Sequence, residues 1–149
     1  MKNKTKVKKI LIIVLVVLFL FVIYNSIWLT WRYFRYTDYT DNMEVFIENT
    51  SYIYTDEEGY DYNVKLPDYL TYTGNLCVAV PDGKYALIIW PNAFDGYEYG
   101  VQLEIDDDTY SIMLNEDFSA QDSQFDDIIY EYSETISDLY ERSVNQWDI

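Results

Sequence analysis

The amino-acid sequence predicts an α+β protein: an N-terminal transmembrane helix, then an antiparallel β-meander of about five strands with a C-terminal amphipathic helix packed on one face. Three observations lead to this prediction. An apolar run without charge occupies residues 10–31, apolar and polar residues alternate between residues 51 and 114, and apolar residues recur every three or four positions after residue 121. These patterns are typical of a membrane span, of half-buried strands and of an amphipathic helix.

Residues 10–31 form the predicted membrane span. These 22 residues carry no charge, and at about 1.5 Å per residue a helix of that length reaches about 33 Å, enough for a hydrocarbon core of about 30 Å. A cleavable signal peptide needs small residues at the last and third-last positions before the cut. Ser26 is the only small residue near the end of the run, and Tyr24 at the matching position is large. The sequence therefore favours a retained signal anchor, with a cleaved signal peptide as the alternative.

The distribution of basic residues predicts the orientation of this span. Five lysines lie within residues 1–9, whereas only Arg32 and Arg35 follow the run closely. Because positively charged flanks stay in the cytoplasm, residues 1–9 are expected to form a basic cytoplasmic head. The chain is then a single-pass membrane protein that contacts the lipid bilayer through residues 10–31 and places its C-terminal domain on the extracellular side.

The extracellular part is strongly acidic. All 26 acidic residues follow residue 36, where only three basic residues accompany them, so this part carries a net charge of −23. Such a charge excludes nucleic acid as a partner, because phosphate backbones require basic surfaces. The abundance of alternating apolar residues predicts one folded domain over residues 49–149 rather than a disordered tail. The single cysteine, Cys77, is expected to be a small core residue rather than a reactive thiol.

The strands are predicted from turn residues and from alternation. Residues 32–48 are a membrane-proximal connector that either continues the helix or forms a first strand near residues 43–47, and the sequence leaves both open. Residues 56–59 (DEEG) and 81–83 (PDG) are typical of hairpin turns, because glycine accepts the backbone angles they require. Residues 97–105 alternate with a period of two, as half-buried antiparallel strands do. An aspartate turn at residues 106–108 then leads to a returning strand.

The period changes to three and four in the last part of the chain, which predicts an amphipathic helix over about residues 121–146. Ser119 or Asp122 is expected to cap it, and the acidic residues in its first turns suit the helix dipole. We expect its apolar stripe to pack on the sheet of the same domain, with docking on another protein as the alternative. The stripe comprises Phe125, Ile128, Ile129, Tyr132, Ile136, Leu139, Tyr140, Val144 and Trp147.

The residue types argue against catalysis and against a cofactor. The chain has no histidine, so the commonest general base and histidine-based metal sites are missing, and its five glycines are scattered over turns rather than gathered in a phosphate-binding loop. The acidic tip comprising Glu104, Asp106, Asp107 and Asp108 offers oxygen ligands of the kind calcium prefers, but it lacks the spacing of a calcium-binding helix–loop–helix. We interpret this tip as a solvated hairpin turn and expect no metal.

Tyrosine is unusually frequent, with 17 in the chain. Four of them, Tyr60, Tyr62, Tyr69 and Tyr72, stand among polar residues and are candidates for binding a partner. Together with the acidic charge, they lead us to expect a non-catalytic, membrane-anchored module that binds a basic protein partner at the outer face of the membrane. The alternative is a carbohydrate-binding or cell-wall-associated module, in which exposed aromatic rings stack on sugars.

Overall fold

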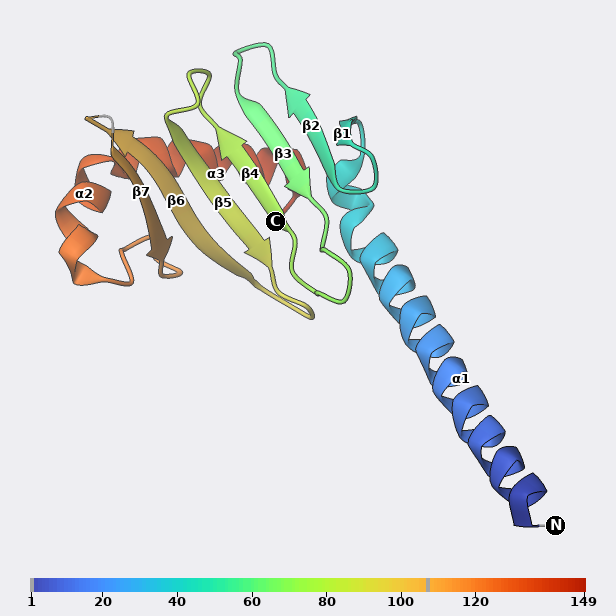
Figure 1. Cartoon of the computed structure of the whole chain (residues 1–149). Coiled ribbons are helices and arrows are strands. Elements are labelled where there is room, and N and C mark those ends of the chain that lie inside the picture. The colour runs from blue at the N-terminus through green and yellow to red at the C-terminus, as the bar shows by residue number, and fades with distance from the viewer. Residues whose placement is uncertain (1, 107) are drawn as a thin grey trace. The chain divides into compact units, whose positions relative to one another are not determined.

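The computed structural model describes residues 2–106 and 108–149, and the chain divides into two compact units (Figure 1). The first unit ends at Arg35. Its structure is helix α1 (Lys2–Tyr36), and only the last residue of this helix, Tyr36, belongs to the second unit. Its segment Lys6–Tyr36 is long and strongly apolar, and its most apolar part is not buried against the rest of the chain. The predicted N-terminal apolar helix is confirmed, with the length and composition of a membrane span or a signal sequence.

The second unit, Tyr36–Ile149, contains a single sheet of seven antiparallel strands in chain order. After the 3-10 helix η1 (Asp38–Thr40), the strands are β1 (Glu44–Ile47), β2 (Ser51–Thr55), β3 (Asp61–Lys65), β4 (Asn75–Ala79), β5 (Tyr85–Pro91), β6 (Tyr97–Ile105) and β7 (Asp108–Leu114). The meander is confirmed, but the predicted number of about five strands was too low. The four residues of β1 are all exposed at the edge of the sheet, so this strand has no alternation to detect. The connector continues the helix to Tyr36 and also supplies β1.

A meander places successive turns at alternate ends of the sheet, and here the two ends differ in chemistry. The β2–β3, β4–β5 and β6–β7 hairpins share one end, which we call the acidic end because its turns include Asp56, Glu57, Glu58, Asp82 and Asp106. The β1–β2, β3–β4 and β5–β6 connections share the other end (Figure 1). We call it the entry end, because it binds Tyr36, the first residue of this unit. The backbone N–H of Gly74 in the β3–β4 loop donates to the hydroxyl of Tyr36 at 2.8 Å.

The core lies on one face of the sheet, beneath the C-terminal helix. Alternate residues of each central strand point to this face, and all are nearly inaccessible to solvent: Val64, Leu76, Val78, Leu87, Ile89, Val101 and Leu103. The covering helix α3 (Ser133–Trp147) buries Ile136, Leu139 and Trp147 against them. Ring contacts join the two layers, since Tyr62 meets Trp147 at 5.9 Å and Tyr99 meets Tyr140 at 5.8 Å between centroids. The stripe therefore packs on its own sheet, and docking of its buried residues on another protein is ruled out.

The predicted C-terminal helix is interrupted. It consists of η2 (Ser123–Phe125), α2 (Asp126–Glu131) and α3, with Tyr132 between the two α-helices. Tyr132 adopts φ −98 and ψ 12, outside the helical region, and the Ser133 hydroxyl donates to the Tyr130 carbonyl at 2.8 Å beside this break. Of the two predicted caps, Asp122 acts as one, because its carboxylate accepts from the backbone N–H of Gln124.

Cys77 differs from the prediction of a core residue. It lies on β4 between the buried Leu76 and Val78, so its side chain points to the opposite face of the sheet, where it is only partly covered. Burial, together with the charge of Asp61, raises the pKa of its thiol to about 11. The thiol is therefore protonated at neutral pH, although it lies outside the core.

Candidate functional site

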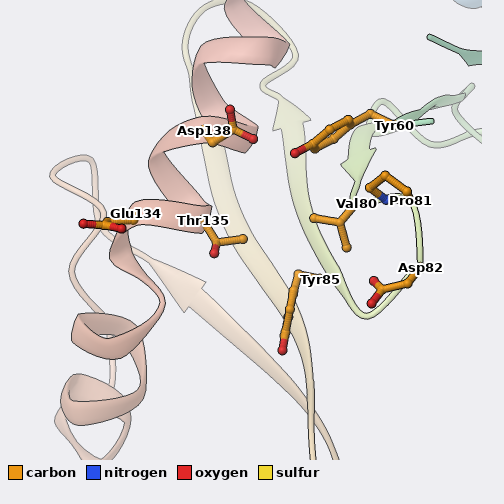
Figure 2. A pocket seen from close by; sticks show the side chains of 8 residues that line it. All are labelled: Tyr60, Val80, Pro81, Asp82, Tyr85, Glu134, Thr135 and Asp138. Atoms are coloured by element: carbon orange, nitrogen blue, oxygen red, sulfur yellow. The ribbon is translucent and has the colours of Figure 1, made fainter. Parts of the chain in front are cut away.

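An open hollow of about 540 Å³ lies at the acidic end, between α3 and two hairpins (Figure 2). Figure 2 shows α3 on one side and the β4–β5 hairpin on the other, with Tyr60 of the β2–β3 hairpin beside them. We call this the acidic hollow, and it is lined by Tyr60, Val80, Pro81, Asp82, Tyr85, Glu134, Thr135 and Asp138. Two tyrosines and three acidic residues thus line a space the size of a small-molecule or side-chain site, although the carboxylate of Glu134 points away from the tyrosines in Figure 2.

The two hairpins hold their contributions to the hollow through turn chemistry. Gly59 adopts φ +88 in the β2–β3 turn, and its N–H donates to the Asp56 carbonyl at 3.1 Å. In the β4–β5 turn, Gly83 adopts φ +73, and the Asp82 carboxylate accepts from the backbone N–H of Lys84 at 3.1 Å. These conformations favour glycine, so the turns fix where Tyr60 and Asp82 lie.

The third wall comes from α3, where residues three and four positions apart share a face. Glu134, Thr135 and Asp138 therefore line the hollow together. Glu134 is exposed and lies in the first turn of the helix, whereas Asp138 is half-buried and lies deeper along it. The hollow thus has one carboxylate at its rim and one beside the ring of Tyr60.

Behind Tyr60, an arginine from α3 shows how such a surface holds a cation. The guanidinium of Arg142 lies over the Tyr60 ring and forms three ion pairs, through Nη1 with Asp56 at 3.4 Å, through Nη2 with Glu58 at 2.6 Å and through Nε with Asp138 at 3.0 Å. Its side chain is only 22% exposed. Partial burial opposes the charge, but hydrogen bonds with Glu58 and Asp138 outweigh it and raise the pKa of Arg142 above its ordinary value.

The pKa values of two neighbours of this arginine, Asp56 and Tyr60, are also shifted. Partial burial opposes ionisation of Asp56, but hydrogen bonds from the Tyr60 backbone N–H and the Tyr62 hydroxyl, with others, lower its pKa below 3.8. Burial, followed by the hydrogen bond with Asp138 and its negative charge, raises the pKa of Tyr60 above 10.0. At neutral pH, Tyr60 is therefore a neutral hydroxyl beside acidic residues, an arrangement that attracts cations.

The four tyrosines singled out in the sequence lie in different places. Tyr60 lines the acidic hollow, whereas Tyr62 is 5% exposed on the core face and packs against Trp147. Its neighbours Asp61 and Asn63 are polar, as the sequence shows, but they face the opposite side of β3, so Tyr62 itself is buried. Tyr69 and Tyr72 lie in the β3–β4 loop at the entry end, away from the hollow. Their role in binding a partner stays a prediction.

Sequence reasoning missed most of the hollow. Asp82 was recognised only as part of a hairpin turn, and no role was predicted for Tyr85, Glu134 or Asp138. The hollow combines residues 60, 80–85 and 134–138. No local pattern connects these three segments, since only the packing of α3 across the sheet brings them together.

The structure describes three residues of the acidic tip of the β6–β7 hairpin, Glu104, Asp106 and Asp108. Glu104 and Asp108 lie on adjacent strands, but Asp108 pairs with Ile105, whereas Glu104 pairs with Thr109. Because neighbouring strand residues point to opposite faces, these two carboxylates diverge. Asp106 adopts φ +52 in the turn, and Asp107 lies outside the described residues. Among residues 2–106 and 108–149, no three histidine, cysteine, aspartate or glutamate side chains gather closely enough to hold a metal ion.

Comparisons with known proteins add no relative to this description. No protein-family model matches the chain, and neither a curated protein nor a solved structure matches it.

Proposed function

We propose that the protein is a non-catalytic, membrane-anchored module that binds a basic side chain of a protein partner in the acidic hollow on the extracellular side. One observation carries this proposal: two tyrosines and three acidic residues line one open space, namely Tyr60, Tyr85, Asp82, Glu134 and Asp138. The net charge of −23 carried by the chain after residue 36 adds a long-range attraction for basic partners.

The chain itself supplies a precedent for the bound group. Arg142 is held by the Tyr60 ring and by carboxylates that include Asp138, and both of these residues also line the hollow. The same chemistry on the solvent side of Tyr60 fits a second guanidinium, which stacks on aromatic rings and pairs with carboxylates through several N–H groups. We therefore expect arginine to bind more tightly than lysine.

Three features support the retained anchor. The helix over Lys6–Tyr36 is apolar along a length that exceeds the bilayer core. Five lysines precede its charge-free run at residues 10–31, and the far end carries Trp28, Trp31 and Tyr33, which suit the membrane interface. Intact mass of the membrane-extracted protein should include the lysine-rich head, whereas a mature form that begins after Ser26 would establish cleavage.

The binding proposal is tested with the full chain in lipid nanodiscs and two short peptides, one rich in arginine and one neutral. We expect the arginine peptide to bind with an affinity that falls steeply as salt rises, because exposed charges are screened over about 10 Å at 0.1 M. The double variant Asp82→Asn, Glu134→Gln should weaken this binding several-fold.

A matched control separates the hollow from the overall charge. Glu98→Gln with Glu104→Gln removes the same two charges from exposed positions of β6 and should leave most of the affinity intact. Equal losses in the two double variants would refute the hollow as the binding site. If the domain instead bound glycan fragments independently of salt, and Tyr60→Ala abolished that binding, the carbohydrate-binding alternative would replace the proposal.

A further inference from the structure

Two loops at the entry end expose large apolar side chains to solvent. In the β3–β4 loop, Tyr69 is 55% and Leu70 51% exposed, and in the β5–β6 turn Phe94 is 98% exposed. Both loops belong to the end of the sheet where Tyr36 is bound, opposite the acidic end. Large apolar groups exposed together at one end of a domain are typical of a contact surface.

The β3–β4 loop holds its exposed residues in a fixed and unfavourable conformation. Leu70 adopts φ +66, a backbone angle that a leucine rarely takes and that asparagine or glycine would take more easily. The loop is held by a hydrogen bond from Thr71 N–H to the Asp68 carbonyl at 2.9 Å and by the buried bond between Gly74 and Tyr36. An apolar side chain kept outward at the cost of backbone strain indicates a role outside the fold.

The β5–β6 turn is held in a similar way. The Asn92 N–H donates to the Gly96 carbonyl at 3.0 Å, and Gly96 adopts φ +80 while its own N–H donates to the Asp95 carboxylate. Phe94 is therefore presented at the tip of a closed turn.

The chain limits how far this end lies from the membrane. Tyr36 is bound to the β3–β4 loop and follows the apolar run, which ends at residue 31, by only five residues. Even fully extended, five residues span at most about 18 Å. A bilayer that holds residues 10–31 therefore lies within reach of the entry end, whatever angle the helix takes to the domain.

We infer that Tyr69, Leu70 and Phe94 insert into the surface of the bilayer that holds α1, which rests on the anchor in the proposed function. Aromatic and aliphatic side chains favour the interfacial region, where inserted segments lie about 5–10 Å into the headgroup boundary. In the β3–β4 loop, the negative charge of Asp68 is compensated by an ion pair with Lys65 at 3.2 Å. The strongly acidic domain favours zwitterionic over anionic lipid. This contact would turn the acidic hollow away from the membrane, toward partners in solution.

The test places a fluorescent label beside Phe94 in the full chain, reconstituted in phosphatidylcholine nanodiscs that contain nitroxide-labelled lipid. In a Cys77→Ala background, Ala93→Cys carries the label at the entry end and Lys84→Cys carries it at the acidic end. We expect quenching at position 93 to exceed that at position 84 several-fold. Phe94→Ser together with Leu70→Asn should reduce it, and Tyr130→Ser, at an 84% exposed position on α2, should not.

Different results would refute the membrane anchor and the contact of the entry end with the bilayer surface. A full chain that does not float with liposomes would refute the anchor and with it the surface contact. A chain that floats but shows equal quenching at positions 93 and 84, or quenching unaffected by the Phe94 and Leu70 substitutions, would refute the surface contact alone and leave the anchor standing.

Discussion

The guanidinium carbon of Arg142 lies 3.6 Å from the centre of the Tyr60 ring. Arg142 is the only arginine after residue 36, and its contacts join α3 to the β2–β3 hairpin, whose turn residues are far from the helix in sequence. The same contacts hold Tyr60 and Asp138 in place as lining residues of the acidic hollow. One cation thus links the stability of the domain to the shape of its candidate binding site.

Arg142→Leu should lower the free energy of unfolding by about 2–3 kcal/mol, because it leaves the partly buried Asp56 without its cation. Arg142→Lys keeps the charge but not the planar group that stacks on Tyr60, so we expect an intermediate loss. Urea unfolding of the full chain in detergent, followed by near-ultraviolet circular dichroism, measures both. As a control, Lys65→Leu removes a more exposed pair with Asp68 and should change stability by less than about 1 kcal/mol. Equal effects at residues 142 and 65 would contradict the structural role of Arg142.

Asp56 predicts how stability depends on pH. Its pKa is lowered in the folded state, so the stabilisation it provides is complete above its unfolded pKa of about 3.9 and is lost as pH falls through the folded value. Asp56→Asn keeps an oxygen acceptor for the backbone N–H groups of Glu58 and Tyr60 but removes the charge. We expect the variant to be less stable by about 1–2 kcal/mol at pH 7. The difference should shrink between pH 4 and pH 2, and a constant difference over that range would show that the charge of Asp56 does not stabilise the fold.

Leu139 tests the packing of α3 on the sheet. Its side chain is fully buried, and Leu139→Ala removes apolar contacts and leaves a cavity, which costs about 2–5 kcal/mol in protein cores. Ser137→Ala on the exposed side of the same helix should cost less than about 0.5 kcal/mol. Unfolding of both variants under the same conditions gives the comparison. A Leu139→Ala protein as stable as the parent would mean that this helix is not part of the core.

The sequence predicted the elements that have a regular apolar period or a glycine in a turn. Apolar and polar residues alternate over residues 97–105, so the sequence indicated which side chains of β6 face the core. The glycines at positions 59 and 83 located two hairpin turns. The edge strand β1 was left open, because four exposed residues at the edge of a sheet need no alternation. The break at Tyr132 was missed as well, because the spacing of Ile129, Tyr132 and Ile136 continues the apolar period through it.

The candidate site was less predictable than the fold for a physical reason. Carboxylates are so frequent in this chain that their types and spacings do not distinguish Asp82 or Asp138 from solvated residues. What distinguishes them is proximity to Tyr60 and Tyr85 across three segments, which depends on the register of the sheet and on the position of α3. The burial of Tyr62 was not predicted either, because its polar neighbours in sequence point to the other face of the strand.

Cys77 provides the last prediction, because its thiol combines partial exposure with a pKa of about 11. A free thiol has a pKa near 8.5, so at pH 8 the folded protein holds far less thiolate, partly offset by the greater nucleophilicity of a more basic sulfur. We expect a water-soluble disulfide reagent to modify native Cys77 at least about tenfold more slowly than the urea-unfolded chain. Asp61→Asn removes the negative charge that contributes to the raised pKa and should speed the native reaction without unfolding the domain. Native and unfolded chains that react at the same rate at pH 8 would show that the environment on this face of β4 does not suppress the thiolate.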